Sequence, residues 1–242
     1  MALRTQLGGL TAAVFPEANA PPRAVAVICH GFGAPGDDLV GLYPELLALE
    51  PSLKDVRFIF PEAPLDLRQS MGFDGRAWWL IDFEQVQAIS RQGPEAVSEF
   101  RLKEPEGMAK ARSLLTALIH EAQAQSGVSL SRFILGGFSQ GAMISTDVAL
   151  RLEEAPLGLA ALSGTLLLED QWKARASRRT GLPVFQSHGR QDPILPFWAA
   201  EKLRDLLVGA GLPHTWSPFD GGHGIPLVVL RGLARFLAER IG

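Results

Sequence analysis

The stretch that decides the fold is SRFILGGFSQGAMI, residues 131–144. Its apolar run at residues 133–135 is typical of a buried strand, and the pattern becomes helical after Gly141. Between them, residues 137–141 match G-x-S-x-G in the strand–turn–helix context that this motif requires. Glycines on either side of such a turn let the helix pack close to the strand. The motif therefore predicts that Ser139 is a nucleophile beside a helix N-terminus, whose free N–H groups suit a developing negative charge.

Composition and charge narrow the classes of protein that this chain can belong to. The 242 residues are 47% hydrophobic and 20% charged, as in ordinary globular proteins, and the net charge of -3 argues against a nucleic-acid binder. The single Cys29 excludes an internal disulfide and fits a reducing compartment. No sustained apolar run suggests a secretory signal or a membrane span. We therefore expect a cytoplasmic protein without stable membrane insertion, and the sequence leaves homodimer formation open.

Apolar runs alternate with helical patterns along the whole chain. A short edge strand is predicted at residues 11–15, and further strands are predicted at residues 24–29, 56–60, 133–135, 157–162, 182–188 and 214–219. Strands that alternate with helices in this way indicate parallel βαβ units with right-handed crossovers. No composition break divides the chain, so we expect a single α/β domain over residues 1–242. Its central sheet should be mostly parallel, with helices on both faces.

Residues 62–104 show little regular periodicity, which is unusual for a connection in a compact domain. The segment carries Phe73, Trp78 and Trp79 and is too apolar for disorder. We interpret it as an ordered loop excursion that covers the site.

A nucleophilic serine needs a histidine base and a carboxylate that orients that base. In parallel sheets such residues lie on loops at the carboxyl ends of strands. Asp192 follows the strand at residues 182–188, and His223 lies in a glycine-rich loop after the strand at residues 214–219. The alternative for Asp192 is a purely structural role in a turn before proline, and Asp170 is the other candidate for the acid of the triad.

The other four histidines fit the role of base less well. His214 is expected inside a strand and His120 on a helix, whereas His30 and His188 end strands before glycine, where a buried structural role is favoured. His223 is therefore the predicted base.

Acyl transfer also needs N–H donors for the oxyanion of the tetrahedral intermediate. One is the backbone N–H of Gln140, the residue after the nucleophile. The second should come from the loop after residues 24–29, where we favour the N–H of Phe32, with Gly33 as the alternative. The loop's glycines are also compatible with an ordinary turn, and no G-K-[ST] supports a phosphate cradle.

Five blocks of sequence together resemble the phospholipase/carboxylesterase family of α/β-hydrolases, which includes acyl-protein thioesterases and small bacterial carboxylesterases. The blocks are H-G-F-G at 30–33, F-P-E-A-P at 60–64, G-F-S-Q-G at 137–141, H-G-R-Q-D-P at 188–193 and G-H at 222–223. The resemblance implies a single-domain α/β-hydrolase with a Ser139–His223–Asp192 triad. It also implies an oxyanion hole from Phe32 and Gln140 and hydrolysis of esters or thioesters without a cofactor. Residues 72–82 match the family's substrate-covering loop only loosely, so the resemblance supports the chemistry better than the substrate.

Candidates for substrate contact lie in that loop. Phe73, Trp78 and Trp79 are predicted to wall an apolar acyl pocket, and the alternative is that they anchor the loop to the body. Arg76 meets either an anionic substrate group or a structural carboxylate, and we favour the carboxylate. No Cys or His cluster has the spacing of a metal site.

The sequence thus favours a serine carboxylesterase for small to medium acyl chains. A thioesterase or lysophospholipase for longer chains is the second hypothesis, and a non-catalytic binding scaffold is a remote third. Loss of a triad residue would mark the scaffold, and none is missing here.

Overall fold

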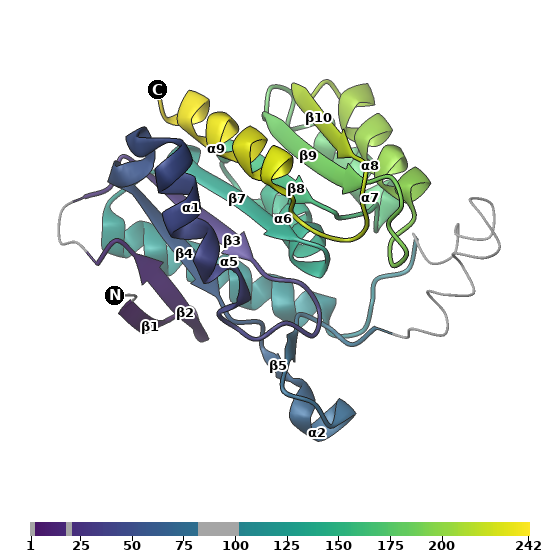
Figure 1. The fold of residues 1–242 in the computed structure, drawn as a ribbon, viewed down its shortest axis with the longest axis horizontal. Coiled ribbons are helices and arrows are strands. Elements are labelled where there is room, and N and C mark those ends of the chain that lie inside the picture. The colour runs from purple at the N-terminus through teal and green to yellow at the C-terminus, as the bar shows by residue number, and fades with distance from the viewer. Residues whose placement is uncertain (1–2, 18–20, 82–101) are drawn as a thin grey trace.

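The computed structural model describes residues 3–17, 21–81 and 102–242. Within these ranges an eight-stranded sheet runs through the centre in the order β1-β2-β4-β3-β7-β8-β9-β10 (Figure 1). The strands are β1 (Leu3–Leu7), β2 (Leu10–Phe15), β3 (Ala24–Cys29), β4 (Val56–Pro61), β7 (Phe133–Phe138), β8 (Gly158–Leu162), β9 (Val184–Gly189) and β10 (His214–Phe219). The pairs β1–β2 and β2–β4 are antiparallel and the others are parallel. The mostly parallel sheet predicted from the sequence is confirmed.

Helices cover both faces of this sheet. One face carries α1 (Leu42–Leu49) and α9 (Leu227–Ile241), which contact each other in front of the sheet in Figure 1. The other carries α5 (Met108–Ser126), α6 (Gln140–Arg151), α7 (Glu169–Ala176) and α8 (Phe197–Gly209). Short 3-10 turns at Asp38–Gly41, Pro51–Asp55 and Leu130–Arg132 join these elements.

Strand β3 shows why a continuous apolar run is needed at the centre of the sheet. Its Val25, Val27 and Cys29 enter the core under α5 and α6, whereas Ala26 and Ile28 enter the core under α1 and α9. Successive side chains point to opposite faces, so a strand covered on both sides has no polar position.

The parallel register brings five loops to one edge of the sheet. Cys29 pairs with Gly137, Phe138 pairs with Leu162, and Gly189 pairs with Phe219. The loops that follow β3, β7, β8, β9 and β10 therefore begin side by side. This edge is where a parallel α/β sheet places its site.

The N-terminal part differs from the prediction. The segment at residues 11–15 is not the edge of the sheet, because β1 pairs outside it through the two-residue turn Gly8-Gly9. Both glycines have positive φ, 56° and 83°, as the favoured hairpin turns require.

The segment predicted as an excursion begins with a small two-stranded sheet, β5 (Leu65–Asp66) and β6 (Arg76–Ala77), which flanks α2 (Leu67–Met71). In Figure 1 this unit projects from the body of the molecule. The part of the excursion at residues 82–101 lies outside the described residues.

A buried carboxylate ties three helices together on the α6 side. Asp147 of α6 accepts hydrogen bonds from Arg112 of α5, from Arg151 Nε at 2.9 Å and from Trp172 Nε1 of α7 at 2.8 Å. A buried carboxylate with these donors is satisfied, so the contacts fix α6 between its neighbours. The N-terminus of α6 is thereby held at the edge where the loops meet.

Strand β10 carries a histidine that should make stability depend on pH. His214 Nε2 donates to Oε1 of Gln186 at 2.9 Å, and burial, with a smaller contribution from Arg204, lowers the pKa of His214 to about 4. The ordinary histidine pKa is about 6.5, so between these values the unfolded chain binds a proton that the folded chain does not. Stability should fall as pH drops from about 6.5 and level off near 4.

Substitution of His214 tests this directly. Because a glutamine Nε2 can still donate to Gln186, His214→Gln should lose less unfolding free energy over this pH range than the native chain. Urea denaturation at several pH values measures the difference. Equal losses in both proteins would contradict the assignment.

Candidate active site

Ser139 occupies a strained turn between β7 and α6. Its φ is 55° and its ψ is -120°, a positive φ that residues with a side chain rarely adopt. A Cβ on Gly137 would lie 2.6 Å from the Cys29 carbonyl oxygen, and a Cβ on Gly141 would clash with the same carbonyl. The two motif glycines thus let α6 pass directly over β3. The turn that the motif predicts is confirmed.

Asp192 and His223 meet across two adjacent loops. His223 Nδ1 lies 2.6 Å from Asp192 Oδ2, and the Asp192 side chain is fully buried. The loops pack backbone against backbone, because a Cβ on Gly189 would clash with the Gly222 carbonyl. The structure therefore brings the predicted acid and base together in the geometry that orients an imidazole.

The carboxylate of Asp192 is held from both sides. Its Oδ1 accepts hydrogen bonds from the N–H groups of Ile194 at 2.8 Å and Leu195 at 2.9 Å. Its second oxygen faces His223 and, at 3.2 Å, the Nε2 of His188. Burial alone would raise the pKa of the Asp192 carboxyl, but hydrogen bonds from His188, His223 and a backbone N–H outweigh it and hold the pKa well below its ordinary value. Asp192 is thus a fixed anion next to His223.

The sequence did not predict that His188 contacts the carboxylate of Asp192. His188 is fully buried as expected, but its Nε2 also lies 2.8 Å from the Leu195 carbonyl oxygen, so it carries a proton that points toward the acid. The signal was present in the sequence, because His188 precedes Asp192 by four residues across a tight turn. Nothing in that spacing alone says that the two side chains meet.

The other candidates for acid and base lie elsewhere. Asp170 is exposed in the first turn of α7. His120 pairs with Glu153 on the surface, at 3.7 Å, and His214 is bound to Gln186. Asp192 is therefore the acid that contacts the predicted base.

The predicted oxyanion loop lies against the nucleophile turn. A Cβ on Gly31 would lie 3.3 Å from the Cβ of Ser139 and 3.3 Å from the Phe138 ring. The Phe138 ring in turn lies 4.7 Å from the His223 ring, centroid to centroid. The loop after β3, the turn at Ser139 and the imidazole of His223 thus form one continuous surface.

That surface opens into a cavity of about 430 Å³, within the range of small-molecule sites. It contains Ser139, His223, Phe32 and Gln140 among its lining residues. The complete lining is Gly31, Phe32, Gly33, Ala34, Asp38, Phe73, Ile81, Phe138, Ser139, Gln140, Met143, Ile194, Leu195 and His223. Most of these side chains are apolar, and Asp38 is the one carboxylate among the described residues that line the cavity.

The four residues predicted to bind substrate separate into two groups. Phe73 lines the cavity and is 42% exposed. Trp78 and Trp79 are 1% and 3% exposed, belong to the core and do not line the cavity, which favours the alternative that they are anchors. Arg76 pairs with the Glu62 carboxylate at 3.2 Å, the structural partner that the sequence favoured. Both tryptophans were expected in the pocket because such pockets are mostly lined by apolar and aromatic side chains. Instead, the Trp78 indole N–H donates to the His30 carbonyl and the Trp79 carbonyl accepts from the Gln140 side chain, inside the protein.

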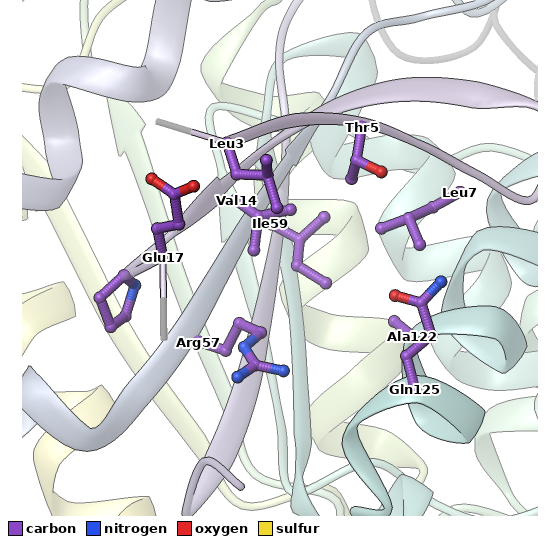
Figure 2. A pocket seen from close by; sticks show the side chains of 10 residues that line it. Leu3, Thr5, Leu7, Val14, Glu17, Arg57, Ile59, Ala122 and Gln125 are labelled. Carbon is purple, nitrogen blue, oxygen red and sulfur yellow. The ribbon is translucent and has the colours of Figure 1, made fainter. Parts of the chain in front are cut away.

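A second hollow, of about 210 Å³, lies under the N-terminal hairpin between β1, β2, β4 and α5 (Figure 2). Its lining is Leu3, Thr5, Leu7, Val14, Pro16, Glu17, Arg57, Ile59, Ala122 and Gln125. It shares no lining residue with the cavity at Ser139, so it is not part of the candidate site.

No cluster of His, Cys, Asp or Glu in the described ranges is arranged to hold a metal ion. Cys29 is fully buried, and burial raises the pKa of its thiol to about 12, which fits inert packing. Among the helices of the described residues, none is long and apolar enough to cross a membrane.

The sequence of this chain is similar to those of known proteins. Residues 11–241 match the phospholipase/carboxylesterase family. The chain belongs to this family. It is 29% identical over 241 residues to acyl-protein thioesterase 1 of Gibberella zeae, with 97% of each chain covered. It is 31% identical over 235 residues to acyl-protein thioesterase 1 of Eremothecium gossypii, covering 96% of this chain and 94% of that one.

Solved structures of similar proteins share the fold. Esterase PE8 has a TM-score of 0.78 and 27% sequence identity, and the match covers 95% of this chain and 98% of that one. The carboxylesterase from Mesorhizobium loti has a TM-score of 0.72 at 18% identity, and the match covers 98% of both chains. The predicted family and the α/β-hydrolase fold are thus confirmed. The protein is a serine hydrolase of the phospholipase/carboxylesterase family, whose membership implies an ester substrate.

The contact between Asp192 and His223 yields the first test of the site. Asp192→Asn removes the anion that orients the imidazole, so kcat for ester hydrolysis should fall by roughly 10⁴-fold. Asp170→Asn is the matched control and should leave kcat unchanged. Steady-state kinetics on a p-nitrophenyl ester measures both. If only the Asp170→Asn variant lost activity, Asp170 and not Asp192 would be the acid of the triad.

Proposed function

We propose that this protein is a carboxylesterase that hydrolyses esters of small to medium acyl chains through an acyl-enzyme. In this proposal Ser139 is the nucleophile, His223 the general base and acid, and Asp192 the carboxylate that orients His223. The observation that carries the proposal is the 2.6 Å contact between His223 and Asp192 at the cavity that Ser139 also lines.

The first half of the reaction forms the acyl-enzyme. Ser139 Oγ attacks the ester carbonyl while His223 Nε2 takes its proton, and Asp192 stabilises the imidazolium through Nδ1–H. The tetrahedral intermediate collapses, His223 gives the proton to the leaving alcohol, and the acyl group stays on Ser139. Water then attacks the acyl-enzyme by the same route and releases the acid.

The backbone N–H groups of Gln140 and Phe32 are proposed as the oxyanion donors. Gln140 is the first residue of α6, so its N–H is one of the groups without an intrahelical acceptor. Support for Phe32 comes from the contact of Gly31 with Ser139, which puts the Gly31–Phe32 peptide beside the nucleophile. Such donors are typically worth about 3–4 kcal/mol of transition-state stabilisation each.

The cavity supports a neutral, apolar acyl group. Phe73, Ile81 and Met143 are among its walls, and no lysine or arginine is among the described residues that line it. Phe73 and Ile81 come from the excursion at residues 62–104, which supports our proposal that this segment of a single domain covers the substrate. A volume of about 430 Å³ lies toward the lower end of small-molecule sites, which favours short and medium chains.

The nucleophile is tested by Ser139→Ala. Without the hydroxyl no acyl-enzyme forms, so kcat should fall by about 10⁶-fold. A p-nitrophenyl butyrate assay measures the loss, and circular dichroism checks that the variant folds. Turnover close to that of the native protein would contradict the proposed role of Ser139.

A thioesterase is the second candidate, favoured by the similarity to two proteins named acyl-protein thioesterase 1. The two functions predict different results in a panel of esters and matching thioesters of increasing chain length. A carboxylesterase with the observed cavity should show kcat/KM highest for short and medium esters and falling for palmitoyl substrates. An increase through palmitoyl, with thioesters preferred over the matching esters, would favour the thioesterase.

A further inference from the structure

The first residue of the oxyanion loop is bound through both of its ring nitrogens. His30 is 2% exposed. Its Nδ1 lies 2.8 Å from the carbonyl oxygen of Gly31, and its Nε2 lies 3.0 Å from the backbone nitrogen of Ala63. Only one tautomer satisfies both contacts, because Nδ1 must donate to the carbonyl and Nε2 must accept from the amide.

The contact with the Gly31 carbonyl also fixes the next N–H. The carbonyl of Gly31 and the N–H of Phe32 belong to one planar trans peptide, so they point in opposite directions. Holding the oxygen therefore aims the N–H of Phe32. A hydrogen bond to the carbonyl also polarises the peptide and strengthens its N–H as a donor.

The surroundings of His30 keep it in this neutral form. Burial lowers the pKa of His30, and the charge of Arg76 acts in the same direction. The hydrogen bond to Gly31 and the charges of Asp38 and Glu62 act in the opposite direction, but burial outweighs them. A second ring proton would point Nε2–H at the N–H of Ala63 and break that contact. The neutral imidazole of His30 can therefore keep its hydrogen bond to the Gly31 carbonyl and fix the Gly31–Phe32 peptide.

A second element secures the same loop from the other side. Residues 76–79, here called the strap, run beside it. Gly33 N donates to the Arg76 carbonyl at 2.8 Å, and Arg76 N donates to the Ala34 carbonyl at 3.0 Å. Gly75 precedes the strap, and a Cβ there would clash with the Gly33 carbonyl, so the close approach needs glycine.

The strap also reaches both ends of the proposed oxyanion hole. Trp78 Nε1 donates to the His30 carbonyl at 2.9 Å. The buried side chain of Gln140 accepts from the N–H of Trp78 at 2.9 Å and donates to the carbonyl of Trp79 at 2.8 Å. Gln140, whose backbone N–H is one proposed donor, thus binds the strap through its side chain. The strap in turn binds the loop that carries Phe32, the other proposed donor.

We propose that His30 is a positioning residue of the oxyanion hole, which aims the Phe32 N–H by holding the Gly31 carbonyl. The strap locks His30 to the side chain of Gln140 and so fixes the spacing of the two donors. This inference rests on the proposed acyl transfer. It also gives Trp78 a role in the reaction without contact with the substrate.

Two substitutions of His30 separate its two hydrogen bonds. His30→Asn puts an amide N–H near the position of Nδ1, so it can hold the Gly31 carbonyl but loses Ala63. His30→Gln puts an amide oxygen near the position of Nε2, so it can hold Ala63 but loses Gly31. His120→Asn, on the surface of α5, is the matched control. Each variant is assayed for kcat, KM, melting temperature and the inhibition constant of a trifluoromethyl ketone, which forms a tetrahedral oxyanion on the serine.

A misaimed donor should cost part of the roughly 10²–10³-fold in kcat that removal of one donor costs. We expect His30→Gln to lower kcat by at least about tenfold, with KM nearly unchanged and the ketone inhibition constant raised by a similar factor. His30→Asn should recover most of that loss at a similar melting temperature. Equal kcat in the two variants, or an unchanged ketone inhibition constant in His30→Gln, would overturn the inference.

Trp78→Phe provides an independent variant if substitutions of His30 do not fold. It removes the indole N–H that binds the His30 carbonyl, together with part of the buried ring system. It should lower kcat and ketone affinity together while KM changes little. Unchanged ketone affinity in a folded Trp78→Phe protein would also overturn the inference. Failure of the proposed function itself looks different, because Ser139→Ala would then keep its activity whatever happens at His30.

Discussion

The site depends on one close backbone contact, between the first turn of α6 and the carbonyl end of β3. Gly137 and Gly141 leave no room for a side chain at the Cys29 carbonyl, so the helix crosses directly over the strand. That crossing forces Ser139 into a positive φ of 55° and sets it beside Gly31. The nucleophile and the oxyanion loop are therefore positioned by the same contact, and the strain in the turn is balanced by the packing of α6.

Two separate networks of hydrogen bonds lie at this edge of the sheet. One surrounds Asp192, whose carboxylate accepts from His223, from His188 and from two backbone N–H groups. The other joins His30, Trp78 and Gln140 through hydrogen bonds of 2.8–3.0 Å. Hydrogen bonds between buried groups are strong and restrict the side chains that make them to one arrangement. Each network orients one part of the proposed machinery, the base in the first and the oxyanion donors in the second.

Strand order made much of the site predictable from the sequence. A turn with G-x-S-x-G, an aspartate after one strand and a histidine after the next had to meet, because parallel strands end at one edge. Side-chain direction could not be predicted in the same way. Trp78 was expected in the pocket, yet its indole N–H reaches the His30 carbonyl, and His188 was expected to be structural, yet it touches Asp192. Strand β1 was missed although Gly8-Gly9 is a hairpin signal, because its polar residues gave a weak strand pattern.

Ser139 is proposed to carry the acyl group, and mass spectrometry of the labelled protein tests this role most directly. The native protein is treated with a fluorophosphonate, digested and sequenced. We expect one phosphonylated residue, Ser139, and no label in the Ser139→Ala variant. A label on another residue, or equal labelling of the variant, would contradict the proposed role of Ser139.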